Sequence, residues 1–151
     1  MIKPYKISVP KSTLNNIYKK VRAYPWKMMQ NVNGWEYGTN YNFLKKISQY
    51  WVSKYNWKKF ENKINSFKNY KTNVDGINLH FIKEKSKNPK SRPLLLLHGW
   101  PGSVIEFFDI IPRLAHPEKF GGKIEDGFDV IVPSLPGFGF STPIKKALGP
   151  R

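Results

Sequence analysis

Two stretches of this sequence decide its fold: LLLLHGWPG at residues 94–102 and FDVIVPSLPGFGFS at residues 128–141. Each is an apolar run that ends in a loop rich in glycine and proline. Parallel strands that are covered on both faces read as continuous apolar runs of this kind. We therefore predict a βαβ unit with strands at Leu94–Leu97 and Phe128–Leu135, which places the chain in the α/β class.

A β-hairpin is predicted ahead of this unit. Residues 71–74 and 77–82 alternate between polar and apolar types and flank Asp75-Gly76. That dipeptide favours the type I′ turn, in which both central residues have a positive φ. The alternation places His80 on the face opposite the main apolar side chains. We expect His80 to be a surface residue of its strand rather than a catalytic base.

Helical patterns precede the hairpin. The first is short, and Ser12 or Thr13 is its expected N-cap. The second runs over residues 39–55, and the third starts at Asn56, which is a good N-cap. We expect their aromatic side chains to pack in a core rather than to contact a ligand.

A further helix is predicted over residues 103–114, between the two apolar strands, with Pro112 marking its end. Together these patterns predict a helical N-terminal segment over residues 1–70. A partial α/β sheet follows over residues 71–151, built from the hairpin and then the βαβ unit.

Composition narrows the class of protein. The chain has no cysteine, so disulfides, thiolate nucleophiles and thiolate metal sites are excluded. We expect no cofactor and no metal. No apolar stretch follows the N-terminus, and none reaches the roughly 18 residues that a membrane span needs. A cytoplasmic protein without a transmembrane segment is the expectation.

The charge of +16 lies in one half of the chain. Residues 1–92 hold 20 lysines and arginines against four acidic residues, whereas residues 93–151 hold six against six. Clustered cations bind polyanions by releasing counterions. However, 22 of the 26 cations are lysines, spread between helical apolar positions, and no nucleic-acid motif is present. We therefore read the charge as a solvated surface and expect no specific nucleic-acid partner.

The turn at His98-Gly99-Trp100-Pro101 is the candidate site. It follows a strand at the carboxyl edge of the sheet, where open α/β sheets place their sites. The backbone N–H of Trp100 could stabilise a developing oxyanion there. The Trp100-Pro101 bond is a candidate cis peptide. The alternative is an ordinary strand–helix turn with a buried Trp100.

These residues resemble a known family. His98–Gly102 and Pro133–Ser141 are similar to loops in the epoxide hydrolase branch of the α/β-hydrolase fold. The HGxP turn is shared with dehalogenases and esterases. The first half of the chain resembles, more specifically, the N-terminal domain of microsomal-type and juvenile-hormone-type epoxide hydrolases. The segments that carry this likeness are Trp35–Thr39, Tyr50-Trp51, Tyr55–Lys59, Glu61, Asn65 and Asp75–Phe81. Asn56 and Lys58 depart from the Asp and Arg of the family.

The resemblance implies hydrolysis of an apolar epoxide to a diol in two steps. A carboxylate nucleophile forms an ester, two tyrosines of a cap polarise the epoxide oxygen, and a His–acid pair activates water. Of these roles only one falls on this sequence, the backbone N–H of Trp100 in the oxyanion hole. His98, Gly99 and Pro101 would shape the turn.

The rest of the catalytic machinery is missing from the sequence. No nucleophile elbow is present, since Gly137–Ser141 reads G-x-G-x-S. Asp109, Asp126 and Asp129 are not placed as nucleophiles, and His116 lies in a loop. We expect a catalytically incomplete N-terminal portion of an epoxide hydrolase, inactive alone and marginally soluble or partly molten. The nucleophile-bearing strand would pair with the other edge of the Leu94 strand, and this open edge also allows self-association.

Three alternatives stay open. The chain could be a non-catalytic epoxide-hydrolase-like module that binds an apolar ligand or a partner subunit. It could be a basic nucleic-acid-binding protein, against which the neutral second half argues. The full-length enzyme could also carry a serine or a dehalogenase-type nucleophile behind the same turn.

Overall fold

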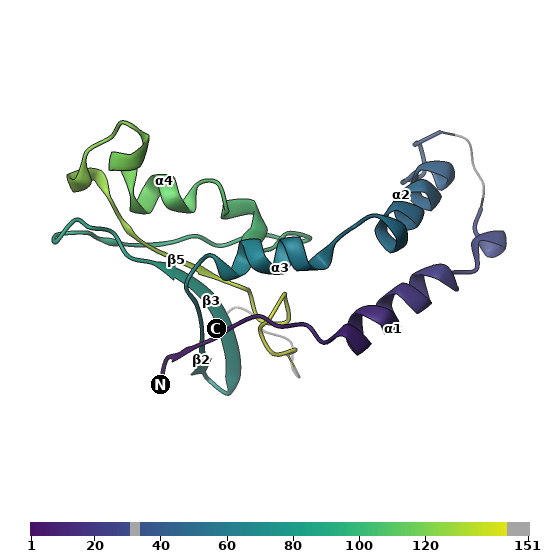
Figure 1. Cartoon of the computed structure of the whole chain (residues 1–151), viewed down its shortest axis with the longest axis horizontal. Coiled ribbons are helices and arrows are strands. Elements are labelled where there is room, and N and C mark those ends of the chain that lie inside the picture. Colours follow the sequence, from purple (N-terminus) through teal and green to yellow (C-terminus); the bar gives the residue numbers. More distant parts are fainter. Residues whose placement is uncertain (31–33, 145–151) are drawn as a thin grey trace. The chain divides into compact units, whose positions relative to one another are not determined.

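The computed structural model describes residues 1–30 and 34–144. Its helices and strands are, in chain order, β1 (Lys3–Pro4), α1 (Lys11–Arg22), α2 (Tyr41–Ser53), α3 (Trp57–Asn65), β2 (Asn69–Val74), β3 (Ile77–Glu84), β4 (Pro93–Leu95), α4 (Ile111–Ala115) and β5 (Asp129–Pro133). Short 3₁₀ helices lie at Trp26–Met28, Val104–Phe107, Pro117–Phe120 and Ile124–Asp126 (Figure 1).

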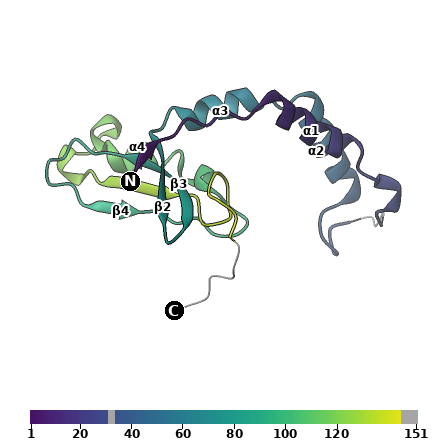
Figure 2. The ribbon, with the colours of Figure 1, turned by 90° about the horizontal axis from the view of Figure 1, so that it is seen from below.

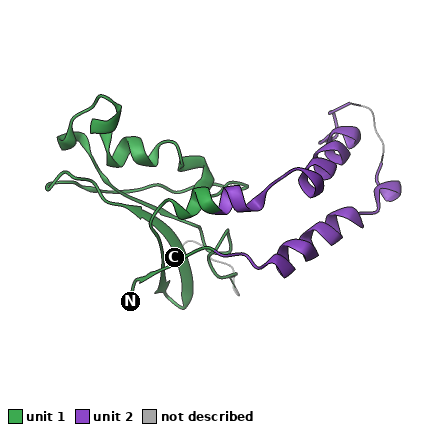
Figure 3. Cartoon of the chain, in the orientation of Figure 1, with its two compact units in different colours: residues 1–7, 62–151 green, residues 8–61 purple. Residues whose placement is uncertain are grey.

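The chain forms two compact units (Figure 3). The sheet unit comprises Met1–Ile7 and Asn62–Arg151, and the helical unit comprises Ser8–Glu61. This division follows compactness in space. The segment boundary expected between residues 70 and 71 concerns the organisation of the family and stays a prediction.

The sheet has five strands in the order β1-β2-β3-β5-β4. β4 and β5 are parallel, with Leu94 paired to Val130, and the other neighbours are antiparallel. The predicted parallel pair is therefore confirmed, although its strands are shorter than the apolar runs. β4 forms one edge of the sheet (Figure 2), so its outer side is open within the described part of the chain.

The predicted hairpin is confirmed. Val74 of β2 pairs with Ile77 of β3, which leaves a two-residue loop between them. Asp75 has a φ of 50° and Gly76 a φ of 83°. Two positive φ angles define the type I′ turn, whose twist matches that of the flanking strands.

The core of the sheet unit lies between the sheet and the segment from residue 104 to α4, which runs along it in Figure 1. Ile82 and Val132 pair across β3 and β5, and both are fully buried. The remaining buried side chains of this layer are Val104, Phe108, Ile111, Ala115 and Val130. The removal of these apolar side chains from water is the main favourable contribution to the stability of this layer.

The helix predicted over residues 103–114 is wrong in its extent. The structure has a 3₁₀ helix at Val104–Phe107 and then a separate short helix, α4, in whose first turn Pro112 lies. Proline fits a first turn because its missing N–H would have no partner there and its φ is already helical. Pro112 therefore helps to begin α4 rather than to end the longer helix.

The surface position expected for His80 is also wrong. Its side chain is fully buried, with none of its surface exposed. The segment around Ser134 and Ser141 covers that face of β3, and Phe140 lies edge-on against the imidazole ring. His80 does lie on the face opposite Leu79 and Phe81, but both faces of β3 are covered at this position.

The helical unit begins differently from the prediction. Ser12 and Thr13 lie inside the first turn of α1, whose N-cap is Pro10, without a side-chain hydrogen bond. In α2 the cap is Asn40, whose side chain accepts from the Phe43 N–H at 3.1 Å. The cap predicted at Asn56 is confirmed, because its side chain accepts from the N–H groups at the start of α3.

Candidate active site

The turn after β4 is tightly closed. The Gly102 N–H donates to the Gly99 carbonyl at 2.8 Å, and the Trp100-Pro101 peptide bond is cis, as predicted. The Trp100 side chain is 84% exposed. The buried position that the alternative gave to Trp100 is therefore wrong, whereas the role of the turn stays a prediction.

His98 fastens this turn to the neighbouring strand. The side chain is buried, and its Nε2 accepts a hydrogen bond from the Leu135 N–H at 3.1 Å. Since Nε2 is the acceptor, the ring hydrogen of the neutral imidazole is on Nδ1, which donates to the Gly99 carbonyl at 3.1 Å. Phe138 packs edge-on against the ring. One histidine thus links the turn after β4 to the loop after β5.

The far side of the turn is held by a capping box. The Ser103 side chain accepts from the Ile105 N–H, and the Glu106 carboxylate accepts from the Ser103 N–H at 3.0 Å. The Glu106 carboxylate occupies the space that a Cβ at Gly102 would need. A side chain at position 102 would therefore displace the Glu106 carboxylate from the capping box, whereas the φ of Gly102 does not demand glycine.

The backbone N–H of Trp100 is the group this scaffold presents. Within residues 1–30 and 34–144, no acceptor is found for it. It stands at the carboxyl end of β4, between Gly99, whose carbonyl is bound twice, and Pro101, which has no N–H. A fixed donor in such a position can bind a carbonyl oxygen or an oxyanion.

The other candidate acids and bases are engaged elsewhere. Asp129 accepts from the Ser91 hydroxyl at 2.8 Å and the Ser86 N–H at 3.0 Å. Burial raises the pKa of Asp129, but these two hydrogen bonds and the positive charges of Lys85 and Lys83 together outweigh burial, so the pKa is lowered. His116 contacts the Glu84 carboxylate at 3.2 Å, and the side chain of Asp109 is exposed.

The structure therefore brings the four turn residues together with Leu135 and Phe138. Within the described residues, Asp109, Asp126, Asp129 and His116 do not contact the turn. The sequence reasoning missed the link from His98 to Leu135. A usable signal was present, since the ends of neighbouring parallel strands meet at one edge of a sheet, so the loops after Leu97 and Pro133 must lie side by side.

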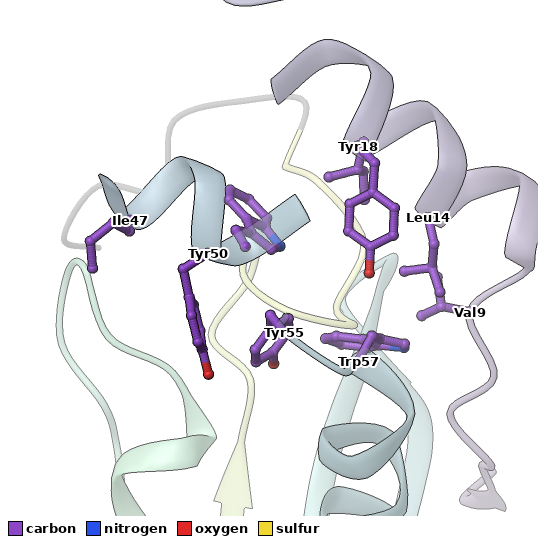
Figure 4. A pocket seen from close by; sticks show the side chains of 9 residues that line it. Val9, Leu14, Tyr18, Ile47, Tyr50, Tyr55 and Trp57 are labelled. Carbon is purple, nitrogen blue, oxygen red and sulfur yellow. The ribbon is translucent and has the colours of Figure 1, made fainter. Parts of the chain in front are cut away.

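A separate hollow of about 490 Å³ lies within the helical unit (Figure 4). Only apolar and aromatic side chains line it: Val9, Leu14, Ile17, Tyr18, Ile47, Tyr50, Trp51, Tyr55 and Trp57. Its lining contains no Asp, Glu, His, Lys or Arg, and its ionisable groups are the tyrosine hydroxyls. In the described residues no helix is long and apolar enough to cross a membrane, and no three His, Asp or Glu side chains gather as metal ligands.

These features define a class of protein: the partial core of an α/β hydrolase. The α/β-hydrolase fold model matches residues 92–147, which include β4, the turn, α4 and β5. The model named epoxide hydrolase N terminus matches residues 2–107. The chain belongs to this epoxide hydrolase family.

Individual relatives agree with this assignment. A putative epoxide hydrolase from Stigmatella aurantiaca (strain DW4/3-1) is 46% identical over 140 residues, covering 93% of this chain and 32% of the relative. Epoxide hydrolase 1 of Oryctolagus cuniculus is 38% identical over 146 residues, covering 93% and 32%. The chain thus spans about a third of the length of the curated relatives it matches.

Solved structures show the same fold. The juvenile hormone epoxide hydrolase of the silkworm Bombyx mori matches 97% of this chain and 35% of its own chain, with 32% identity and a TM-score of 0.81. The epoxide hydrolase of Aspergillus niger matches 97% and 38%, with 29% identity and a TM-score of 0.75. The predicted fold class and family resemblance are confirmed.

Proposed function

We propose that this chain contributes the oxyanion-binding turn of an enzyme that hydrolyses apolar epoxides to diols. One observation carries the proposal: the Trp100 N–H lacks an acceptor in the described part of the chain and lies at the carboxyl end of β4. When water attacks the ester formed on a carboxylate nucleophile, negative charge develops on the ester carbonyl oxygen. A fixed N–H donor stabilises that charge by about 3–4 kcal/mol.

The neighbouring residues serve this donor without touching the substrate. His98 binds the Gly99 carbonyl, and Gly102 closes the turn through its N–H. A preorganised donor needs no rearrangement when charge develops, and this is the main source of its catalytic effect.

The remaining chemistry requires residues that this sequence does not contain in a recognisable motif. We propose that the carboxylate nucleophile, the His–acid pair and the cap tyrosines lie on polypeptide that follows the turn in the whole enzyme. Its nucleophile strand would pair with the open edge of β4. The second oxyanion donor would be the N–H after the nucleophile. The share of the relatives that the chain spans, about a third, supports this division.

Two measurements test this division of roles. The chain alone should release no diol from styrene oxide above the buffer rate. The chain joined to the remaining part of the Stigmatella aurantiaca relative should release it. Diol from the chain alone, or none from the joined protein when it is folded, would contradict the proposal.

The donor itself is tested in the joined protein. Trp100→Pro removes the N–H and should lower turnover by about 10²- to 10³-fold, with the ester intermediate accumulating. Trp100→Ala keeps the N–H and is the matched control, which should retain far more activity. Equal losses in the two variants would assign the effect to the exposed side chain instead.

Three further predictions accompany the proposal. Reading the encoding DNA past the codon for Arg151 should reach a Gly-x-Asp-x-Gly elbow and later a histidine, whereas a stop codon there would favour the binding-module alternative. Self-association through β4 would appear as a concentration-dependent mass in sedimentation. The cytoplasmic location stays a prediction, and cell fractionation can check it.

A further inference from the structure

A second histidine, His80, lies at the centre of a buried polar network in the sheet unit. Its Nε2 is 3.0 Å from the Asn69 side-chain oxygen, and its Nδ1 is 2.9 Å from the Ser134 hydroxyl. His80, Asn69 and Ser134 are all buried, as is Ser141. Buried polar groups are costly unless they are satisfied, so a network of this kind restrains the segments that it joins.

The contacts of Asn69 decide the state of the ring. Its amide nitrogen donates to two backbone carbonyls, those of Ile64 and Phe67, both at 2.8 Å. Its oxygen is therefore the acceptor, and the His80 Nε2 must carry the hydrogen. The opposite nitrogen, Nδ1, then accepts from the Ser134 hydroxyl. The geometry thus selects the neutral ring in a single tautomer.

His80 fastens both ends of the loop that follows β5. The Ser134 N–H donates to the His80 carbonyl at 2.9 Å, and the His80 N–H donates to the Ser141 hydroxyl at 3.0 Å. That hydroxyl in turn donates to the Ser134 carbonyl at 2.7 Å. The loop from residue 134 to residue 141 is therefore closed upon itself and tied to β3.

The same loop holds the turn after β4. Leu135, the residue next to Ser134, donates its N–H to His98, and Phe138 packs against the His98 ring. Phe140 packs against the His80 ring. The loop thus lies between two histidines, one of which shapes the candidate oxyanion turn.

We propose that His80 is a positioning residue for the candidate active site: by fixing Ser134 and Ser141, it sets the place of the Leu135 N–H and through it the orientation of His98. The inference rests on the proposed function only in treating the turn as catalytic. The measurements below report on positioning, whether or not the whole enzyme hydrolyses epoxides.

The electrostatic surroundings keep the ring neutral. Burial and, to a smaller extent, the positive charge of Lys71 together lower the pKa of His80 to about 4. Among the described residues, the ionisable groups near the ring are Tyr5, which follows β1, and Lys71 on β2. The Tyr5 ring lies edge-on to the His80 ring, and the Lys71 Nζ lies 4.0 Å from the centre of the Tyr5 ring. A neutral ring preserves the tautomer on which the network depends.

The test compares His80→Gln and Ser134→Ala with the unmodified chain, and His116→Gln is the matched control. His116 lies in the same unit, but its ring contacts Glu84 rather than the network. Hydrogen exchange of the Leu135 amide is measured against that of the Phe128 amide, which donates to the Leu114 carbonyl. Nitrogen NMR of the His98 ring reports its tautomer.

The expected result is selective. Each network variant should speed exchange at Leu135 by about tenfold relative to Phe128, because the loop loses a buried hydrogen bond. The His98 signals should change from a pure Nδ1–H tautomer to a mixture, which a general loss of stability would not cause. The control should change neither reading.

Several outcomes would overturn the inference. One is equal acceleration at Leu135 and Phe128, which would make His80 a stability residue only. Another is an unchanged His98 tautomer in both network variants. A third is a Leu135 amide that is already unprotected in the unmodified chain. If His80→Gln fails to fold, Ser134→Ala removes a single hydroxyl and decides the matter.

Discussion

The two units of this chain use similar side chains to very different ends. All ten buried hydrophobic side chains among the described residues belong to the sheet unit. In the helical unit, α1 and α2 bury none, and large side chains such as Tyr50 and Trp51 remain 53% and 42% exposed. An apolar stripe on a helix therefore predicts which face can pack against another element, but not that this element is present.

A buried polar side chain also organises contacts within each unit. In the sheet unit it is His80, and in the helical unit it is Glu61. The Glu61 carboxylate accepts from the Val9 N–H at 2.8 Å and the Trp57 Nε1 at 2.9 Å, and pairs with Lys58. The Lys58 hydrogen bond comes first among the causes that lower the Glu61 pKa to about 2. One of these side chains is a neutral ring and the other carries a charge.

The largest expected difference is in hydrogen exchange. Amides of β3 and β5 should be protected about a hundredfold more than those of α1 and α2, because local opening of a helix without buried side chains costs little. Exchange of the intact chain, read by NMR, checks this. High protection in both units would show that the helical unit is covered in solution. Low protection in both units would support a partly molten chain.

Core truncation should separate the units next. Ile82→Ala in the sheet unit should lower the free energy of unfolding by about 2–5 kcal/mol, because Ile82 is fully buried. Ile47→Ala in α2 is the matched control, and should cost less than about 0.5 kcal/mol, because Ile47 is 45% exposed. Denaturant unfolding measures both. A large loss at Ile47 would contradict the comparison.

Acid should weaken the two units in different pH ranges. The pKa of His80 is 6.5 unfolded and about 4 folded, so only the unfolded chain binds the proton in between. The contribution of neutral His80 to the free energy of unfolding is fully present above pH 6.5, and about 3 kcal/mol of it is lost as the pH drops to 4. For Glu61 the corresponding loss runs from pH 4.5 down to 2. His80→Gln should remove the first loss, and a variant that keeps it would disprove the assignment.

The smallest expected effect concerns helix caps. Asn40→Ala should destabilise α2 by about 1 kcal/mol, because the Phe43 N–H loses its acceptor. Ser12→Ala should leave α1 almost unchanged, because Ser12 lies inside the helix and not at its cap. Helix populations from backbone chemical shifts check both. A larger loss at Ser12 would restore the N-cap first predicted there.

The sequence predicted what depends on neighbours in the chain. The hairpin follows from Asp75-Gly76 and its flanking alternation, and the parallel pair follows from two apolar runs. His80 was misplaced because the segment that covers it arrives more than fifty residues later, at Ser134. Pro112 was misread because proline both ends one helix and begins another, and only packing decides which.

The candidate site divides in the same way. The turn residues and the cis bond were predictable because a strand, a glycine and a proline determine them locally. The meeting of the two loops was predictable from the parallel strands, but the particular partner of His98 was not, because residue types do not show which backbone N–H a side chain accepts from. Residue types predict the turn, whereas the hydrogen bond that holds it to its neighbour depends on where the two strands end.

The position of β4 in the sheet affects how the chain folds while it is being synthesised. β4 leaves the ribosome before β5, and His98 must wait for Leu135, which lies 37 residues later in the chain. At 5–20 residues per second, this delay is about 2 to 7 seconds. During that time the four leucines at positions 94–97 lack β5, the strand that pairs with β4, so an apolar segment stays without its partner while synthesis continues.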